Sequence, residues 1–133
     1  MRFKSEEDYQ QFLRLRDLEA RKALPDSDDD TPDDGPESVL AGKIGTWAKD
    51  HGYPILSFRQ SAKARGFIPA GWPDCTLILP EGRTVFIELK AGKGRLRKEQ
   101  KQLRLMFMTL GHEYHVAKSM QRFLEIVGNA QTI

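Results

Sequence analysis

Apolar residues recur at helical spacing in four segments of the chain. In the clearest of these segments, apolar side chains occupy positions i, i+3, i+4 and i+7 of one helical face. These side chains are Leu103, Met106, Phe107 and Leu110. Gly111 follows directly and is expected to end that helix. The pattern predicts helices over residues 5–22, 37–51, 97–110 and 120–127.

Four shorter segments have the composition of β-strands, being apolar throughout or alternating between apolar and polar positions. They are residues 54–59, 75–79, 84–90 and 113–118. After the first helix, the order along the chain is helix, three strands, helix, strand and helix. This order is typical of an α/β domain, so we expect one central mixed sheet of about four strands flanked by helices. The first helix is then an N-terminal addition.

An acidic segment rich in proline follows the first helix. Residues 25–36, with the sequence PDSDDDTPDDGP, offer almost nothing that a core could bury, and we predict a flexible linker. An acidic segment that mimics nucleic acid and shields a basic surface is the alternative. The chain is therefore expected to divide into an N-terminal helix (1–24), this linker, and a folded domain (37–133).

The net charge of +2 hides a strong asymmetry along the chain. Residues 1–37 hold twelve acidic and six basic side chains, whereas residues 38–133 hold seven acidic and fifteen basic ones. The folded part thus carries +8, which suits a polyanionic partner, and nucleic acid is the first candidate. A well-solvated basic surface without a specific partner is the alternative reading.

Several functional classes are disfavoured by composition. No apolar run approaches the roughly 20 residues of a membrane span, and the N-terminus lacks the apolar stretch of a secretory signal. The one cysteine, Cys75, cannot form an internal disulfide or a cysteine-based metal site. The sequence Gly92-Lys93-Gly94 lacks the spacing of a phosphate-binding loop, so no nucleotide cofactor is expected. A cytoplasmic protein is the simplest interpretation.

Charged residues interrupt one face of the strand predicted over residues 84–90. Because side chains alternate along a strand, Phe86, Glu88 and Lys90 share a face, and Val85 and Ile87 point the other way. A Glu and a Lys on an otherwise apolar strand are costly to bury without partners. We therefore expect them to meet a partner or to perform chemistry.

The turn before this strand supplies a partner for the glutamate. Pro80-Glu81-Gly82 suits a three-residue hairpin loop, with Pro80 leading a type I turn and Gly82 in the left-handed position. In that register Asp74 lies opposite Glu88, with the two carboxylates within about 5 Å. Such a pair repels unless a proton or a cation joins it, and Mg²⁺ is commonly bound by one or two carboxylates. Lys90, next on the same face, is placed to hold a water or to neutralise a phosphate.

These residues resemble a known signature. Pro73-Asp74 followed by Glu88-Leu89-Lys90 is similar to the PD…ExK motif of the PD-(D/E)XK nuclease superfamily. Further segments resemble the virus-type replication-repair nuclease (VRR-NUC) domain across residues 37–119. They are Glu37-Ser38, GWPD, ELKAGKGRL, Gln100 and LGHEYHVAKS. That family occurs alone in phages and fused to the end of the Fanconi-associated nuclease.

The resemblance implies a restriction-endonuclease-like core and a role for each matching residue. Asp74 and Glu88 would bind the metal, with the Leu89 carbonyl as a further ligand, and Lys90 would be the catalytic lysine. From the first helix of the domain, Glu37 would act as an outer acid that binds the metal directly or through water. At the start of the later helix, Gln100 would lie beside Lys90 and orient the site. The family often has Ser-Pro two or three residues before that glutamine, where this chain has Arg97-Lys98-Glu99.

The expected function is that of a Mg²⁺-dependent endodeoxyribonuclease in which Mn²⁺ can substitute. Basic residues near the site are expected to contact DNA phosphates; they are Lys63, Arg65, Lys93, Arg95, Arg97, Lys98 and Lys101. Stand-alone members of the family imply a homodimer that cuts branched DNA such as four-way junctions, in the host cytoplasm if the chain is phage-encoded. The alternatives are a catalytically weak DNA-binding module of the same fold and a flap-cutting or restriction-type nuclease.

Overall fold

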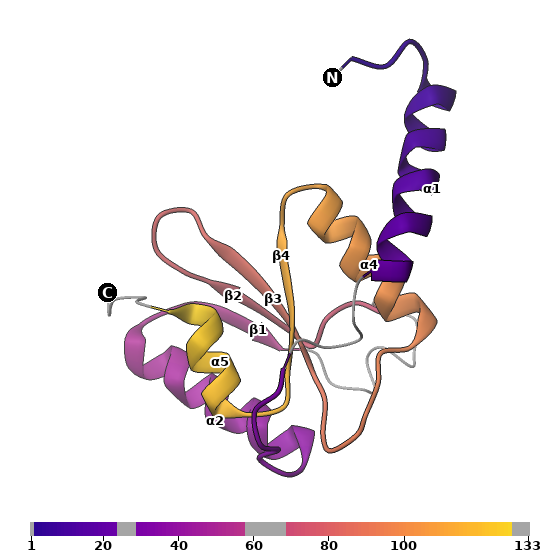
Figure 1. The fold of residues 1–133 in the computed structure, drawn as a ribbon. Coiled ribbons are helices and arrows are strands. Elements are labelled where there is room, and N and C mark those ends of the chain that lie inside the picture. The colour runs from indigo at the N-terminus through magenta and orange to yellow at the C-terminus, as the bar shows by residue number, and fades with distance from the viewer. Residues whose placement is uncertain (1, 24–28, 58–68, 129–133) are drawn as a thin grey trace.

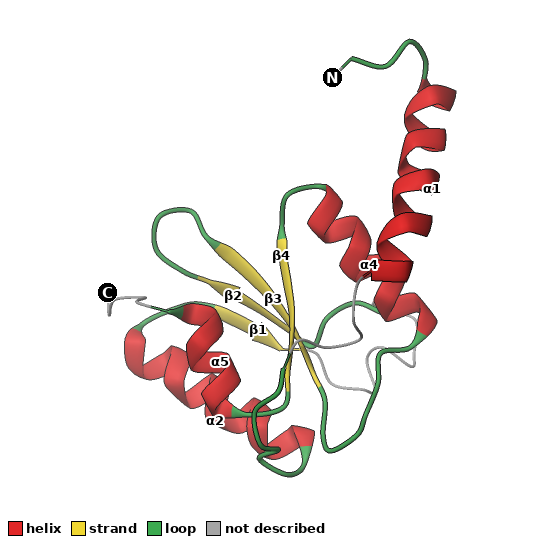
Figure 2. Cartoon of the chain, in the orientation of Figure 1, coloured by secondary structure: helices red, strands yellow, loops and turns green. Residues whose placement is uncertain are grey.

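The computed structural model describes residues 2–23, 29–57 and 69–128, except for the side chains of residues 17–23. The helices and strands, drawn in Figures 1 and 2, are α1 (Glu6–Ala23), α2 (Glu37–His51), β1 (Ile55–Ser57), β2 (Cys75–Ile78), β3 (Thr84–Leu89), α4 (Lys98–Thr109), β4 (Glu113–Ala117) and α5 (Met120–Val127). All the helices and strands that the hydrophobic pattern predicts are present, and their ends within the described residues agree to within one or two residues. The last two residues of the first predicted strand, 58 and 59, lie outside the described residues.

The sheet is mixed and has the strand order β1-β2-β3-β4. The first three strands are antiparallel neighbours, and β4 returns parallel to β3 after the α4 crossover. Between β2 and β3, Cys75 pairs with Ile87 and Leu77 pairs with Val85. This is the register that a three-residue loop predicts, so the sequence-based alignment of the two strands is confirmed.

The turn that sets this register differs in type from the prediction. Leu79 donates a backbone hydrogen bond to Arg83 (2.8 Å), and Arg83 donates to Pro80 (3.3 Å). Both residues between Pro80 and Arg83 have positive φ, 63° at Glu81 and 73° at Gly82, as in a type I′ turn. A type I turn was expected, but the primed form matches the right-handed twist of the two strands better.

Helices cover the two faces of the sheet differently (Figure 1). Helices α2 and α5 pack together on one face, where Leu40 and Ile44 meet Ile87 and Phe123 in an apolar cluster. Helix α4 covers the other face, where its Phe107 packs with Tyr114, Val116 and other side chains. The strand β3 therefore contributes alternate side chains to two separate interiors.

The N-terminal helix lies along α4 and extends beyond the sheet (Figure 1). Tyr9 and Leu13 of α1, with Leu105 and Met106 of α4, help to line an apolar groove of about 500 Å³. Met106 is more than half exposed, whereas its neighbour Phe107 belongs to the core. None of the helices in the described segments has both the length and the apolar composition of a membrane span.

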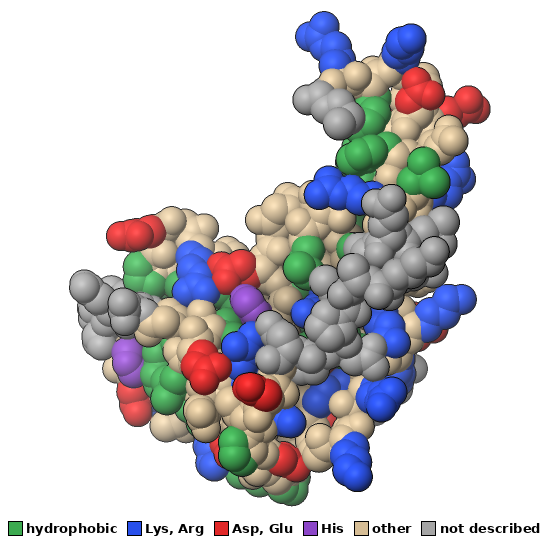
Figure 3. Space-filling view, in the orientation of Figure 1, with side chains coloured by type: hydrophobic (Ala, Val, Ile, Leu, Met, Phe, Trp, Pro, Cys, Tyr) green, Lys and Arg blue, Asp and Glu red, His purple; other side chains and the backbone are tan. Residues whose placement is uncertain are grey.

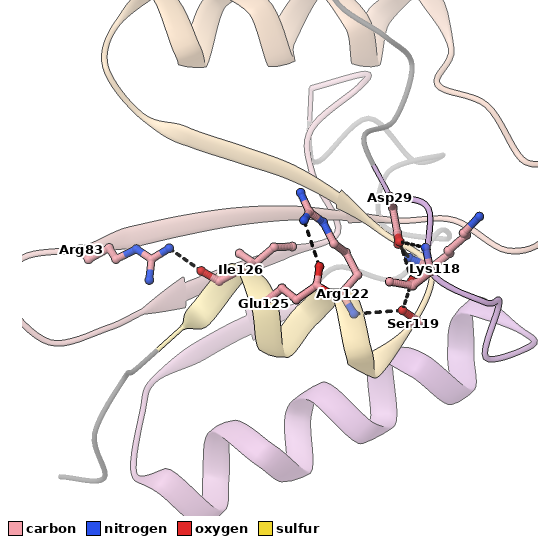
Figure 4. Close-up of polar contacts among 8 residues, drawn as sticks. Asp29, Arg83, Lys118, Ser119, Arg122, Glu125 and Ile126 are labelled. Atoms are coloured by element: carbon pink, nitrogen blue, oxygen red, sulfur yellow. Dashed lines mark hydrogen bonds and ion pairs between the residues drawn. The ribbon is translucent and has the colours of Figure 1, made fainter.

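Residues 29–36, which belong to the segment predicted to be a flexible linker, make contacts with the folded domain. The carboxylate of Asp29 is buried and accepts hydrogen bonds from the backbone of Lys118 (2.8 Å) and of Thr31 (2.9 Å). The Thr31 hydroxyl contacts Ser119, which caps α5, and Figure 4 shows Asp29 beside Lys118 and Ser119. Asp34 accepts from the backbone of Met120 (2.8 Å). Aspartates here bind backbone N–H groups, a use that composition does not reveal; residues 25–28 lie outside the described residues.

Candidate active site

Glu88 lies deep in the face of the sheet that α4 covers. Its side chain is on β3 with only 3% of the residue surface exposed. Oε1 accepts a hydrogen bond from Nε2 of Gln100 (2.8 Å) and lies 3.9 Å from Nζ of Lys90. The predicted shared face of Glu88 and Lys90 is therefore confirmed. Since an isolated buried carboxylate costs several kcal/mol, these two partners are needed to keep it there.

Gln100 joins the start of α4 to the sheet through both ends of its amide. Its Oε1 accepts from the backbone N–H of Arg97 (2.8 Å), which caps the helix, while Nε2 donates to Glu88. We expected Gln100 to lie beside Lys90 and orient the site; its hydrogen bond goes to the same Glu88 oxygen that Lys90 approaches. Gln100 is only 6% exposed, and its two hydrogen bonds hold the Glu88 side chain in one orientation.

Asp74 reaches across from the residue before β2. Its Oδ2 accepts a hydrogen bond from the backbone N–H of Leu89 (2.9 Å). Because Cys75 pairs with Ile87, the next position of the register sets Asp74 opposite Glu88, as the loop length predicts. The Asp74 carboxylate thus lies against β3, one residue from the Glu88 backbone.

A glycine allows the turn that carries Asp74 to touch α4. Gly71 has a φ of +84°, and a Cβ there would lie 2.6 Å from the carbonyl carbon and oxygen of Glu99. It would also lie 2.9 Å from the backbone nitrogen of Gln100. Only glycine fits this contact without a shift. The sequence GWPD therefore packs Asp74 and Gln100, from distant parts of the chain, into one site.

The donor set fits a hard divalent cation. Among the described residues, no three His, Cys, Asp or Glu side chains gather closely enough to hold a metal ion. Asp74 and Glu88 give two carboxylates, and Mg²⁺ is typically held by one or two of them with waters and phosphate oxygens. The structure does not bring Glu37 to them: it lies exposed at the first residue of α2. Its role as an outer acid and that of the Leu89 carbonyl as a ligand stay predictions.

A run of exposed basic side chains leads from the site to α4. It consists of Lys93, Arg95, Arg97, Lys98 and Lys101, all exposed. Figure 3 shows Lys and Arg side chains gathered at the lower right, over the segment between β3 and α4. The other two basic residues expected to contact DNA, Lys63 and Arg65, lie outside the described residues.

Sequence reasoning missed two buried polar residues on the same face. Arg104, one helical turn after Gln100, is 5% exposed, and Tyr114 of β4 is 2% exposed. Burial raises the pKa of Tyr114, and the charges of Glu88 and Asp74 raise it further, while Arg104 opposes them. The spacing of Gln100, Arg104 and Phe107 at i, i+4 and i+7 was a signal that Arg104 faces the sheet.

This chain is similar in structure to a solved VRR-NUC domain. A protein described as a VRR_NUC domain protein matches with a TM-score of 0.55 and 20% sequence identity, over 72% of this chain and 87% of the other. No protein-family model matches the chain, and no curated protein matches it significantly. The chain therefore has the fold of the VRR-NUC domain, a mixed α/β architecture with a four-stranded sheet flanked by helices.

Proposed function

We propose that the protein is a Mg²⁺-dependent endodeoxyribonuclease, with Mn²⁺ able to substitute. The observation that carries the proposal is the assembly of Asp74, Glu88, Lys90 and Gln100 at one end of two adjoining strands. The VRR-NUC fold supports it, since that fold is the scaffold of a nuclease domain. Burying Glu88 with Lys90 and Gln100 has a cost that a purely structural core avoids.

Each residue has a distinct task in this proposal. A divalent cation held by Asp74 and Glu88 supplies positive charge that polarises a phosphate and activates a water. The Lys90 ammonium orients that water or neutralises charge that develops on the phosphate oxygens. Gln100 keeps the Glu88 carboxylate in place through its 2.8 Å hydrogen bond, and the Leu89 N–H does the same for Asp74.

Cleavage of labelled linear and branched DNA tests the proposal. Activity is expected with Mg²⁺ or Mn²⁺ and is expected to vanish with EDTA. Asp74→Asn and Lys90→Ala should each lower the rate at least about a hundredfold, since each removes a charge at the reacting centre. Asp50→Asn and Lys49→Ala make the same chemical changes at exposed positions of α2 and should cut like the unaltered protein.

The same assay separates the alternatives. A protein that binds DNA but does not cut it with either metal ion would be a DNA-binding module. Cleavage that persists in Asp74→Asn would place the chemistry elsewhere.

The exposed basic run supports DNA binding through phosphates. Counterion release then makes affinity fall steeply as salt rises. Charge reversal at Arg97 and Lys101 should weaken binding to all DNA sequences about equally and reduce the salt dependence, as fluorescence anisotropy can measure. Affinity that does not respond to salt would contradict this role. Lys63 and Arg65 are proposed to contribute in the same way.

The preferred substrate is proposed to be branched DNA, such as a four-way junction, cut by a homodimer. One chain offers one such site, whereas two symmetric cuts need two sites related by a two-fold axis. The groove between α1 and α4, which exposed Met106 and Leu110 help to line, is the proposed contact with the second copy. Light scattering should give twice the 15.2 kDa chain mass. A monomer that cuts flaps and leaves junctions intact would defeat this part alone.

A further inference from the structure

Tyr114 carries a polar group that its packing does not use. The residue is 2% exposed, and its ring packs edge-on against Phe107 of α4 with centroids 5.6 Å apart. None of the residues that the structure describes forms a hydrogen bond with the Tyr114 hydroxyl. Phenylalanine would fill the same space, and burying a hydroxyl without a protein partner is unfavourable. The hydroxyl therefore calls for an explanation other than packing.

The strand register places Tyr114 diagonally next to Glu88. Tyr114 pairs with Phe86 of β3, and the next residue of β3 on that face, Glu88, pairs with Val116. Glu88 is in turn held by Gln100, which comes from the same helix as Phe107. Tyr114 is thus enclosed between β3 and α4, within the cluster of polar groups that forms the candidate active site.

Burial favours the neutral form of the Tyr114 hydroxyl. Burial first, and then the charges of Glu88 and Asp74, raise the pKa of the phenol. The oxygen of a neutral phenol can accept a hydrogen bond. A water bound to a cation turns its lone pair to the cation and donates through its hydrogens, so such an oxygen is a suitable partner for it.

Tyr53 provides an internal comparison. It is 3% exposed, and its hydroxyl also forms no hydrogen bond with the described residues. It packs in the apolar cluster on the opposite face, with the rings of Trp47 and His51 as neighbours. The two tyrosines match in burial and differ in their neighbours, so they separate a packing role from a role in the site.

We propose that Tyr114 is a positioning residue whose hydroxyl oxygen accepts a hydrogen bond from a water in the hydration shell of a cation held by Asp74 and Glu88. The inference rests on the proposed function and adds a residue that sets the affinity for the cation. Mg²⁺ keeps several waters when it binds to proteins, and outer hydrogen bonds to such a site typically change affinity by about 10–100-fold.

The test compares Tyr114→Phe with Tyr53→Phe. Calorimetric titration with Mn²⁺ should show the dissociation constant of Tyr114→Phe raised by about 10–100-fold. Its metal-free melting temperature should be unchanged or higher, because the variant removes a buried hydroxyl that no described residue pairs with. The melting temperature of Tyr53→Phe should respond in the same way, with unaltered Mn²⁺ binding. Saturating Mn²⁺ should restore most of the cleavage by Tyr114→Phe.

Three outcomes would overturn the inference. Wild-type Mn²⁺ affinity in Tyr114→Phe, an equal loss in both variants, or a lower metal-free melting temperature in Tyr114→Phe would each leave the hydroxyl without this role. If the unaltered protein binds no Mn²⁺, the proposed function fails as well. If it binds Mn²⁺ and Tyr114→Phe binds equally well, only the role of Tyr114 fails.

Discussion

The two faces of the sheet are built from alternate residues of the same strands and have opposite character. Beneath α2 and α5, strand β3 presents Val85, Ile87 and Leu89 to a cluster of apolar side chains. Beneath α4, the same strand presents Phe86 and then Glu88 to a mixed interior. That interior also buries Gln100, Arg104 and Tyr114. The first face accounts for stability, while the second accepts the cost of polar burial in a way that stability does not explain.

The largest change in stability should come from a charge placed on the apolar face. Ile87→Glu adds an acidic side chain one residue before Glu88 on β3. It lies on the opposite face of the sheet, away from Lys90 and Gln100. Because Ile87 is fully buried in the apolar cluster, we expect a loss of more than about 4 kcal/mol in the free energy of unfolding, or complete unfolding, in denaturant titration. Leu56→Glu, at an exposed position of β1, is the control and should cost little. An Ile87→Glu protein of normal stability would show that the two faces do not differ as described.

A smaller loss of stability is expected at Gly71, where the turn that carries Asp74 packs against the backbone of α4. Gly71→Ala combines a positive φ, at about 1–2 kcal/mol, with a clash against the backbone of Glu99, at about 1–3 kcal/mol. Gly82 has a similar φ of +73°, but no atom lies within 4 Å of a Cβ added there. Gly82→Ala should therefore lose only the stability that the positive φ costs. Thermal unfolding gives both values, and cleavage should fall for Gly71→Ala alone. Equal losses in the two variants would refute the close packing of the GWPD turn on α4.

The sequence predicts the elements and the register because both depend on local patterns. Hydrophobic spacing marks each element, and the length of the loop from Pro80 to Gly82 sets Asp74 opposite Glu88. What it misses depends on contacts between distant segments. Arginine is usually a solvated residue on a helix. The spacing of Arg104 from Gln100 and Phe107 indicates which face it shares, but how deeply it is buried depends on how α4 lies on the sheet.

The acidic segment before α2 makes contacts that its composition does not indicate. Asp29 and Asp34 belong to a stretch whose composition predicts disorder, yet their carboxylates accept backbone hydrogen bonds from Lys118 and Met120. Those donors lie more than eighty residues further along the chain. No local pattern points to them, so the contact could be found only from the folded structure.

The smallest effect concerns an ion pair at the edge of the apolar face. Arg83 binds Glu113 through two hydrogen bonds (2.7 and 2.8 Å) and donates to the last carbonyls of α5, including that of Ile126 (Figure 4). The hydrogen bond from Arg83 lowers the pKa of Glu113 to about 2. Its contribution to stability is therefore present above the unfolded-state pKa of about 4.5 and is lost as the pH falls toward 2.

Because the pair is about one-third exposed, solvent screening should keep its contribution below about 1 kcal/mol. Glu113→Gln should lower the melting temperature slightly at pH 7 and reduce the loss of stability between pH 4.5 and 2. Cleavage should be unchanged, since this pair stabilises the fold and lies outside the candidate active site. A loss of cleavage without a loss of stability would contradict that division.

Glu88→Gln tests the contrast between the faces most directly. The substitution keeps the size of the side chain and an oxygen that can accept from Gln100, and it removes the charge. Melting temperature and Mg²⁺-dependent cleavage are to be measured on the same preparation. We predict a melting temperature within a few degrees of that of the unaltered protein and a loss of cleavage of at least about a thousandfold. Cleavage that survives the substitution, or that falls only as far as the protein unfolds, would contradict the claim that this face is kept for chemistry.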